Sequence, residues 1–234
     1  MKTKEFDNKP RPTVVLGDIH GSTYWKTVVD ENPACRYIFL GDYLDPYENI
    51  SRNQLINNLK KIIQLKKERP DDVILLLGNH DLHYIRLDID LCSRFDEAIA
   101  KDAYYLFVEN KHLFSFAFQE DNRIYTHAGI SQKWFLDDFG GDMEKNIAEQ
   151  LNNPHPDQLP ALYRCGWFRG GDINASGGIF WADITELIDL GAPLQGYIQF
   201  VGHNRVDKIC KYTRNEGIIF FCDCLYNEIY YKLE

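Results

Sequence analysis

Five short polar motifs supply the residues of this chain that can do chemistry, and each follows a run of apolar residues. They are Gly-Asp-Ile-His-Gly at 17–21, Gly-Asp-Tyr-Leu-Asp at 41–45, Gly-Asn-His-Asp at 78–81, Thr-His-Ala-Gly at 126–129 and Gly-His-Asn at 202–204. Carboxylate, imidazole and amide side chains are common metal ligands. Because each set stands at the end of a predicted buried strand, the sequence predicts that they meet at one metal site, with two ions.

The candidate ligands divide between two metal positions that share one carboxylate. Asp18 and His20 are two residues apart, so both side chains can face one point from an extended or loop backbone. Asp42 can bridge two cations because a carboxylate has two oxygens with spare lone pairs. We therefore expect Asp18, His20 and Asp42 at the first ion, and Asp42, Asn79, His127 and His203 at the second.

Such a centre is suited to the hydrolysis of phosphate esters. Two cations about 3.5–4 Å apart can hold a hydroxide between them and clamp the phosphoryl oxygens of an in-line displacement. No nucleophilic side chain is then needed, but a leaving alkoxide still needs a general acid. We expect His80, next to a predicted ligand, to be that acid, with Asp45 holding its imidazole protonated and correctly oriented.

Strands and helices alternate in the first half of the chain. Buried-strand patterns lie at 13–16, 37–40 and 73–77, and helices are predicted over 23–30, 51–68 and 96–107, with another directly after Gly-Asn-His-Asp. Ser51 is the expected cap of the long helix, along which apolar residues recur at three- and four-residue spacing.

The second half is predicted to be mostly β structure. It contains a hairpin of strands 112–118 and 122–126, a helical segment over 131–158, a long functional loop over 159–181 and four short strands within 197–232. The whole pattern predicts an α/β (four-layer α+β) fold, in which two mixed β-sheets form a sandwich flanked by helices. At 234 residues we expect one domain over 1–234, with a polar N-terminal arm at 1–12.

The composition and the net charge limit the kinds of partner and the cellular location that we expect for this chain. A net charge of −9 makes nucleic acid an improbable partner, since nothing neutralises the phosphate backbone. The longest aliphatic run, Val73–Leu77, is far shorter than the ~20 residues of a membrane span, and no signal peptide is visible. Six scattered cysteines favour a reducing, cytoplasmic location, and we interpret Cys222 and Cys224 as core residues.

In their order along the chain, these motifs resemble the calcineurin-like metallophosphoesterase superfamily: Asp-x-His, Gly-Asp-x-x-Asp, Gly-Asn-His-Asp, His-Ala-Gly and Gly-His. Three details are similar to the phosphoprotein-phosphatase branch of this superfamily. They are the motif Gly17–Gly21, the motif His127–Ile130, and Arg205, which stands where other branches carry a second histidine. That branch includes bacterial and phage phosphatases and symmetrical diadenosine tetraphosphatases. The resemblance implies the metallophosphoesterase fold and a first metal with one ligand position open to water.

One departure from that branch concerns phosphate binding. The branch follows the second motif with Asp-Arg-Gly, whose arginine grips phosphate, but here Asp45 precedes Pro46 and Tyr47. Arg169, in a glycine-rich loop, is our first candidate for the missing clamp because its planar fork suits bidentate binding, and Arg205 is the second. Tyr43, Tyr47, Phe168 and Trp181 are candidates for the cleft wall, and His83, His112 and His155 are interpreted as ordinary surface or structural residues.

We therefore predict an enzyme, a dinuclear metal-dependent phosphatase. It hydrolyses phosphate monoesters of proteins or small molecules through a metal-bridging hydroxide. The mixed ligand set favours manganese or iron, and zinc is possible. The first alternative is a symmetrical dinucleoside tetraphosphate hydrolase or nucleotide phosphodiesterase. The second is a non-catalytic interaction scaffold on the same fold, against which the retention of all six ligands with His80 and Asp45 argues.

Overall fold

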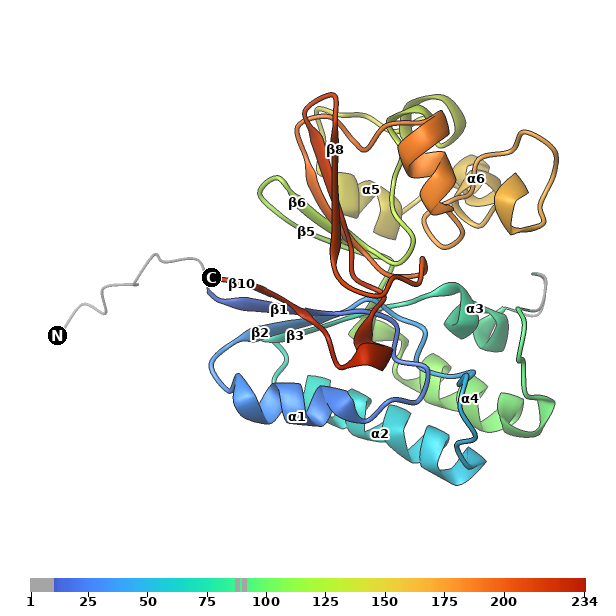
Figure 1. Cartoon of the computed structure of the whole chain (residues 1–234). Coiled ribbons are helices and arrows are strands. Elements are labelled where there is room, and N and C mark those ends of the chain that lie inside the picture. The colour runs from blue at the N-terminus through green and yellow to red at the C-terminus, as the bar shows by residue number, and fades with distance from the viewer. Residues whose placement is uncertain (1–10, 87–88, 90–91) are drawn as a thin grey trace, which may run out of the picture.

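The computed structural model describes residues 11–86, 89 and 92–234, and its strands form two sheets of five strands each (Figure 1). The first sheet has the order β10-β1-β2-β3-β4; β1 to β4 run parallel and β10 runs antiparallel to β1. Its strands are β1 (Thr13–Leu16), β2 (Arg36–Phe39), β3 (Val73–Leu76), β4 (Phe114–Ser115) and β10 (Tyr231–Leu233).

The second sheet has the order β5-β6-β7-β9-β8, with β6, β7 and β9 parallel and both edge strands antiparallel. Its strands are β5 (Ala117–Glu120), β6 (Arg123–Thr126), β7 (Ile198–Val201), β8 (Cys210–Arg214) and β9 (Gly217–Phe221). Both sheets are mixed, so the predicted fold class is confirmed.

Three helices cover the outer face of the first sheet (Figure 1): α1 (Tyr24–Glu31), α2 (Arg52–Glu68) and α4 (Glu97–Glu109). Their apolar faces pack on alternate strand residues, so that Trp25, Leu59 and Phe107 share one core with Leu16 and Phe39. The Ser51 side chain accepts from the backbone N–H of Gln54 and completes a capping box at the start of α2. These helices are confirmed at nearly the predicted bounds.

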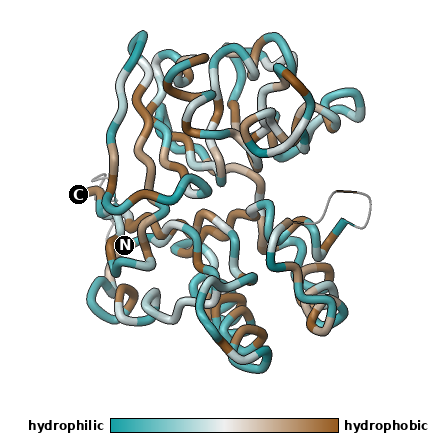
Figure 2. Tube along the Cα trace, turned by 45° about the vertical axis from the view of Figure 1, so that its right-hand side comes forward, coloured by the Kyte–Doolittle hydropathy of each residue, from teal (hydrophilic) through white to brown (hydrophobic). Residues whose placement is uncertain are grey.

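A second core lies between the two sheets, where Val15, Ile38 and Leu76 of the first sheet meet Tyr125 and Phe200 of the second. The rings of Tyr125 and Phe200 stack with their centroids 5.0 Å apart. Because the central strands are covered on both faces, they are apolar almost throughout, and Figure 2 shows this as hydrophobic strands joined by more hydrophilic loops.

Two predictions for the middle of the chain were wrong. The expected strand 112–118 is a helical turn (Lys111–Leu113) followed by β4 and β5, which belong to different sheets. The chain crosses at Phe116, where the N–H groups of Phe116 and Ala117 both donate to Asn152 Oδ1. The hairpin is therefore formed by β5 and β6 alone.

The segment 131–158 is not one helix but a π-helical turn (Trp134–Asp138), α5 (Ile147–Asn152) and a short turn (Pro156–Gln158). Gly140 breaks it with a φ of 67°. The expected loop 159–181 is mostly irregular, although it contains α6 (Leu159–Leu162) and the turn Trp167–Arg169. The four strands within 197–232 are confirmed as β7 to β10. Among the described residues, no helix is long and apolar enough to cross a membrane.

Candidate active site

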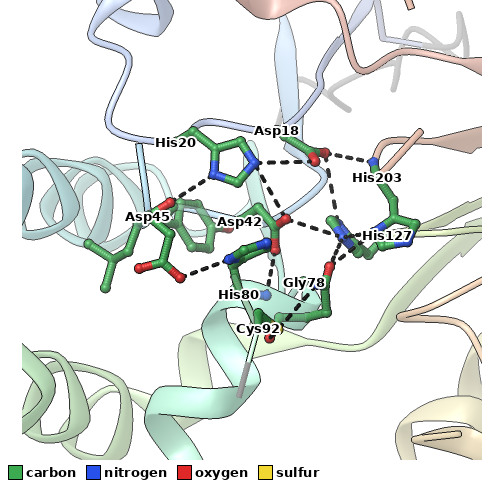
Figure 3. Close-up of polar contacts among 12 residues, drawn as sticks. Asp18, His20, Asp42, Asp45, Gly78, His80, Cys92, His127 and His203 are labelled. Atoms are coloured by element: carbon green, nitrogen blue, oxygen red, sulfur yellow. Dashed lines mark hydrogen bonds and ion pairs between the residues drawn. The ribbon is translucent and has the colours of Figure 1, made fainter. Parts of the chain in front are cut away.

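The five motifs converge where strands of both sheets end (Figure 3), and two glycines make the close approach possible. A Cβ on Gly78 would stand 2.1 Å from Asp42 Oδ1, and a Cβ on Gly202 would stand 2.1 Å from Asp18 Oδ1. Neither glycine has a positive φ, so both are needed for space rather than for backbone freedom. At both glycines the backbone therefore packs directly against the carboxylate of a candidate metal ligand.

The backbone at the site is strained. His20, Asp42, Asp45 and His203 have φ values of 40°, 52°, 56° and 61°, a left-handed conformation that L-residues rarely adopt. Each costs on the order of 1 kcal/mol or more, and such strain gathers at functional sites because it aims side chains that a regular strand would turn away. Backbone bonds from His20 N to Asp42 O at 2.7 Å and from Gly21 N to Tyr43 O at 3.0 Å hold the two loops together.

Asp18, His20 and Asp42 form the first set of donor atoms, all within 4.8 Å of one another. His20 Nδ1 donates to Leu44 O at 2.8 Å, so the lone pair is on Nε2, which faces Asp18 Oδ2 at 3.8 Å and Asp42 Oδ2 at 3.6 Å. Burial, together with neighbouring carboxylates, raises the pKa of both Asp18 and Asp42. A lone pair between two buried carboxylates fits a bound cation.

Asn79, His127 and His203 form the second set, with Asp42 as its shared member. His127 Nδ1 donates to Leu40 O at 2.8 Å, which leaves Nε2 facing Asn79 Oδ1 at 2.9 Å, His203 Nδ1 at 3.2 Å and Asp42 Oδ2 at 3.5 Å. Burial lowers the pKa of His127 to about 3 and also lowers that of His203, so both rings are neutral. Four donor atoms therefore face one point, which fits a second cation.

His80 lies against both sets and is fixed by Asp45 (Figure 3). Its Nδ1 is 2.8 Å from Asp45 Oδ2, its backbone N–H donates to Asp42 Oδ1 at 2.9 Å, and its ring meets that of His20 edge-on at 5.2 Å. Burial lowers the pKa of His80, although Asp45 opposes the shift. With Nδ1 engaged, Nε2 is the nitrogen left for a substrate.

Asp45 is held by more partners than the sequence suggested. His83 Nε2 lies 2.8 Å from Asp45 Oδ2, and the Tyr84 hydroxyl donates to Oδ1 at 2.5 Å. Burial raises the pKa of Asp45, but the hydrogen bonds from His80, His83 and Tyr84 outweigh it, and the net shift is downward. His83 is thus a buried structural residue of this site; its signal was the spacing of three from His80 on one helix, α3 (Asn79–Ile85).

Two further aspartates support the site, and sequence reasoning gave neither of them a role. Asp81 accepts from the backbone N–H groups of Asp42, Tyr43 and Gly78 at 2.8, 2.9 and 2.8 Å. It therefore clamps the loop after β2 to the loop after β3. Asp223 is buried beside Asp18, and burial raises its pKa to about 6. The sequence signal for Asp81 was its place as the fourth residue of Gly-Asn-His-Asp, and the signal for Asp223 was its place just after the apolar strand β9.

The candidate ligands other than His127 line a cavity of about 330 Å³, to which Tyr47, Cys92, Ser93, Arg169 and Trp181 also contribute. Two aromatic predictions were wrong. Tyr43 is buried beneath the sheet and donates to Leu76 O at 2.8 Å, and Phe168 is exposed on a different pocket.

The two candidate arginines are placed differently. Arg169 lines the cavity, with Nε 2.8 Å from Asp183 Oδ2 and Nη2 2.5 Å from Asn204 Oδ1. Arg205 is exposed at the rim, with its guanidinium against Tyr47 and Tyr226. Arg169 is therefore the only one of the two candidates that reaches the cavity wall.

A family model for calcineurin-like phosphoesterases matches residues 11–220. The chain belongs to the calcineurin-like phosphoesterase family. Its first donor set, Asp18, His20 and Asp42, is a candidate metal-binding group of the kind on which this family depends.

A curated protein phosphatase is similar in sequence to part of this chain. Serine/threonine-protein phosphatase ppe1 of Schizosaccharomyces pombe is 37% identical over 79 residues, which are 32% of this chain and 24% of that protein. The match thus spans about a quarter of that relative's length.

Two solved structures resemble most of the chain. A cold-active protein-tyrosine phosphatase of a psychrophilic Shewanella has a TM-score of 0.60 at 16% identity, over 92% of this chain and 72% of that one. A protein serine/threonine phosphatase from Saccharomyces cerevisiae has a TM-score of 0.53 at 13% identity, over 94% and 69%. At these identities the likeness concerns the fold alone.

Proposed function

We propose that the protein is a dinuclear metal-dependent phosphatase that hydrolyses phosphate monoesters. One observation carries the proposal: two sets of donor atoms share Asp42, and His80 lies against both with one ring nitrogen engaged by Asp45. The metal ligands are Asp18, His20 and Asp42 at one position and Asp42, Asn79, His127 and His203 at the other. Manganese or iron suits this mixed set best, and zinc is the alternative.

The bound cations would activate water and neutralise the charge on the phosphoryl oxygens. The protein's own contribution begins with binding: Arg169, at the cavity wall, contacts a phosphoryl oxygen beside its bond to Asp183. His80 Nε2 donates a proton to the leaving oxygen, and Asp45 holds the ring in the orientation that this transfer needs. The relatives named as phosphatases support a phosphorylated substrate, which can be a small molecule or a protein.

The test is a pair of initial rates on manganese-loaded protein, with p-nitrophenyl phosphate as the monoester and bis-p-nitrophenyl phosphate as the diester. The monoester should turn over, a chelator should abolish the rate, and His80→Ala should lower kcat by about 10²–10⁴-fold on a monoester with a poor leaving group, such as a phosphoserine peptide. His112→Ala, which removes an exposed histidine, is the matched control.

The other outcomes discriminate between functions. Turnover of the diester alone moves the assignment to a phosphodiesterase. No turnover of either ester by protein that holds two metal ions contradicts the proposal and favours an interaction scaffold on this fold.

A further inference from the structure

The ring of Tyr47, at the mouth of the cavity, contacts the guanidinium groups of two arginines that are far apart in the sequence. The Arg94 guanidinium lies 3.8 Å from the centroid of the Tyr47 ring, and the Arg205 guanidinium lies 4.6 Å from it. The same ring meets His20 edge-on at 5.0 Å. Two cations are therefore held beside a predicted metal ligand.

Arg94 is attached to the loop that carries Asp45. Its Nε donates to Asp45 O at 3.0 Å, and its Nη1 donates to Ser93 Oγ at 3.2 Å, so it stands beside the residue that precedes Pro46. Its backbone φ is 64°, a strained conformation for a non-glycine residue. Both Ser93 and Tyr47 line the cavity, so the guanidinium is held at the cavity rim.

Among the described residues neither rim arginine forms a salt bridge, although the charge of Arg205 acts on the buried Asp223 carboxylate and opposes the rise of its pKa. In contrast, Arg52 pairs with Asp96 at 2.7 Å and Arg169 pairs with Asp183 at 2.8 Å. Unpaired guanidinium groups supported by an aromatic ring are suited to binding an anion with several oxygens.

We propose that Arg94, with Arg205 beside it, is the phosphate-binding residue of the outer half of the site and selects doubly charged monoesters over singly charged diesters. The inference deepens the proposed function and rests on it. A monoester dianion presents three terminal oxygens, so one can face the guanidinium while the others remain at the donor sets. A diester has two terminal oxygens and one charge, and it gains less from a rim cation.

The experiment compares Arg94→Ala, Arg94→Lys and Arg205→Ala with Arg52→Ala, which removes a surface arginine from an ion pair outside the cavity. Arg94→Ala should lower kcat/KM for p-nitrophenyl phosphate about 10- to 100-fold, the range of one charge-assisted hydrogen bond. For the diester the loss of kcat/KM should stay below about threefold. Arg94→Lys should recover only part of the lost kcat/KM for the monoester, because the point charge of lysine lacks the planar fork of arginine. An equal loss on both esters, or none on either, overturns the assignment.

A second measurement does not depend on turnover. Calorimetric titration with inorganic phosphate should show weaker binding by Arg94→Ala than by wild type and Arg52→Ala, at unchanged unfolding midpoints and metal content. Equal affinity, or no binding by any of them, overturns the inference. Wild-type protein that binds phosphate through Arg94 but hydrolyses no monoester would contradict the proposed function alone.

Discussion

Asp81 offers a sharp test of how the site is assembled, because its role is to hold loops and not to bind metal. Its carboxylate is buried and accepts three backbone N–H bonds from the loops that carry Asp42 and Asn79. Oδ2 takes the N–H groups of Asp42 and Gly78, and Oδ1 takes that of Tyr43.

The magnitude follows from how many donors each substitution leaves unpaired. In Asp81→Asn the amide oxygen can keep the two bonds at Oδ2, while the amide nitrogen faces the Tyr43 N–H. One buried donor is then lost, which costs about 1–3 kcal/mol of unfolding free energy. Asp81→Ala leaves all three N–H donors without a partner, but it also removes a buried carboxylate whose pKa is raised by burial. We therefore expect a net loss of about 3–5 kcal/mol in the free energy of unfolding.

The assay is urea unfolding of the metal-free protein, followed by metal analysis of the reloaded protein. Asp71→Asn, on the exposed turn before β3, is the control and should match wild type. We expect the order wild type, Asn, Ala in stability, and weaker metal retention in both variants because Asp42 loses its backbone anchor. An Asp81→Asn protein with the unfolding midpoint and metal content of wild type would refute this account of the site.

Three further predictions concern other residues. Gly202→Ala should weaken metal binding at least about tenfold in a chelator competition, because its Cβ would stand 2.1 Å from Asp18 Oδ1; undiminished affinity would mean that the loop moves freely. Tyr43→Phe should lower the free energy of unfolding in urea by about 1 kcal/mol, because the hydrogen bond to a backbone carbonyl is lost, and it should leave kcat unchanged. A lower kcat would indicate that Tyr43 contacts the substrate after all. Burial raises the pKa of Glu186 above 4.5, so the folded state loses stability as the pH rises from there. The Tm of Glu186→Gln should therefore rise relative to that of wild type between about pH 4 and about pH 8. A difference in Tm that stays constant over this range would contradict the direction of the pKa shift.

Much of the first half of the fold could be predicted from local patterns. The apolar runs before Asp18, Asp42 and Asn79 form strands, as their local patterns predict, and Ser51 begins α2 through its own side chain. These features depend on residues close together in the sequence, where propensity and periodicity act. The prediction failed at 112–118, because the choice between one strand and two depends on Asn152 and on which sheet each half joins.

For the site, local sequence patterns establish which chemical groups are available: six candidate ligands, a histidine beside one of them, and glycines that leave room for carboxylates. How these groups are oriented and paired depends on the packing of the folded chain. It turned four site residues into left-handed backbone, gave Asp45 three donors instead of one, and brought Arg94 and Arg205 to the same tyrosine. The physical reason is that these contacts join loops far apart in the chain, and only the packing of the two sheets brings those loops together.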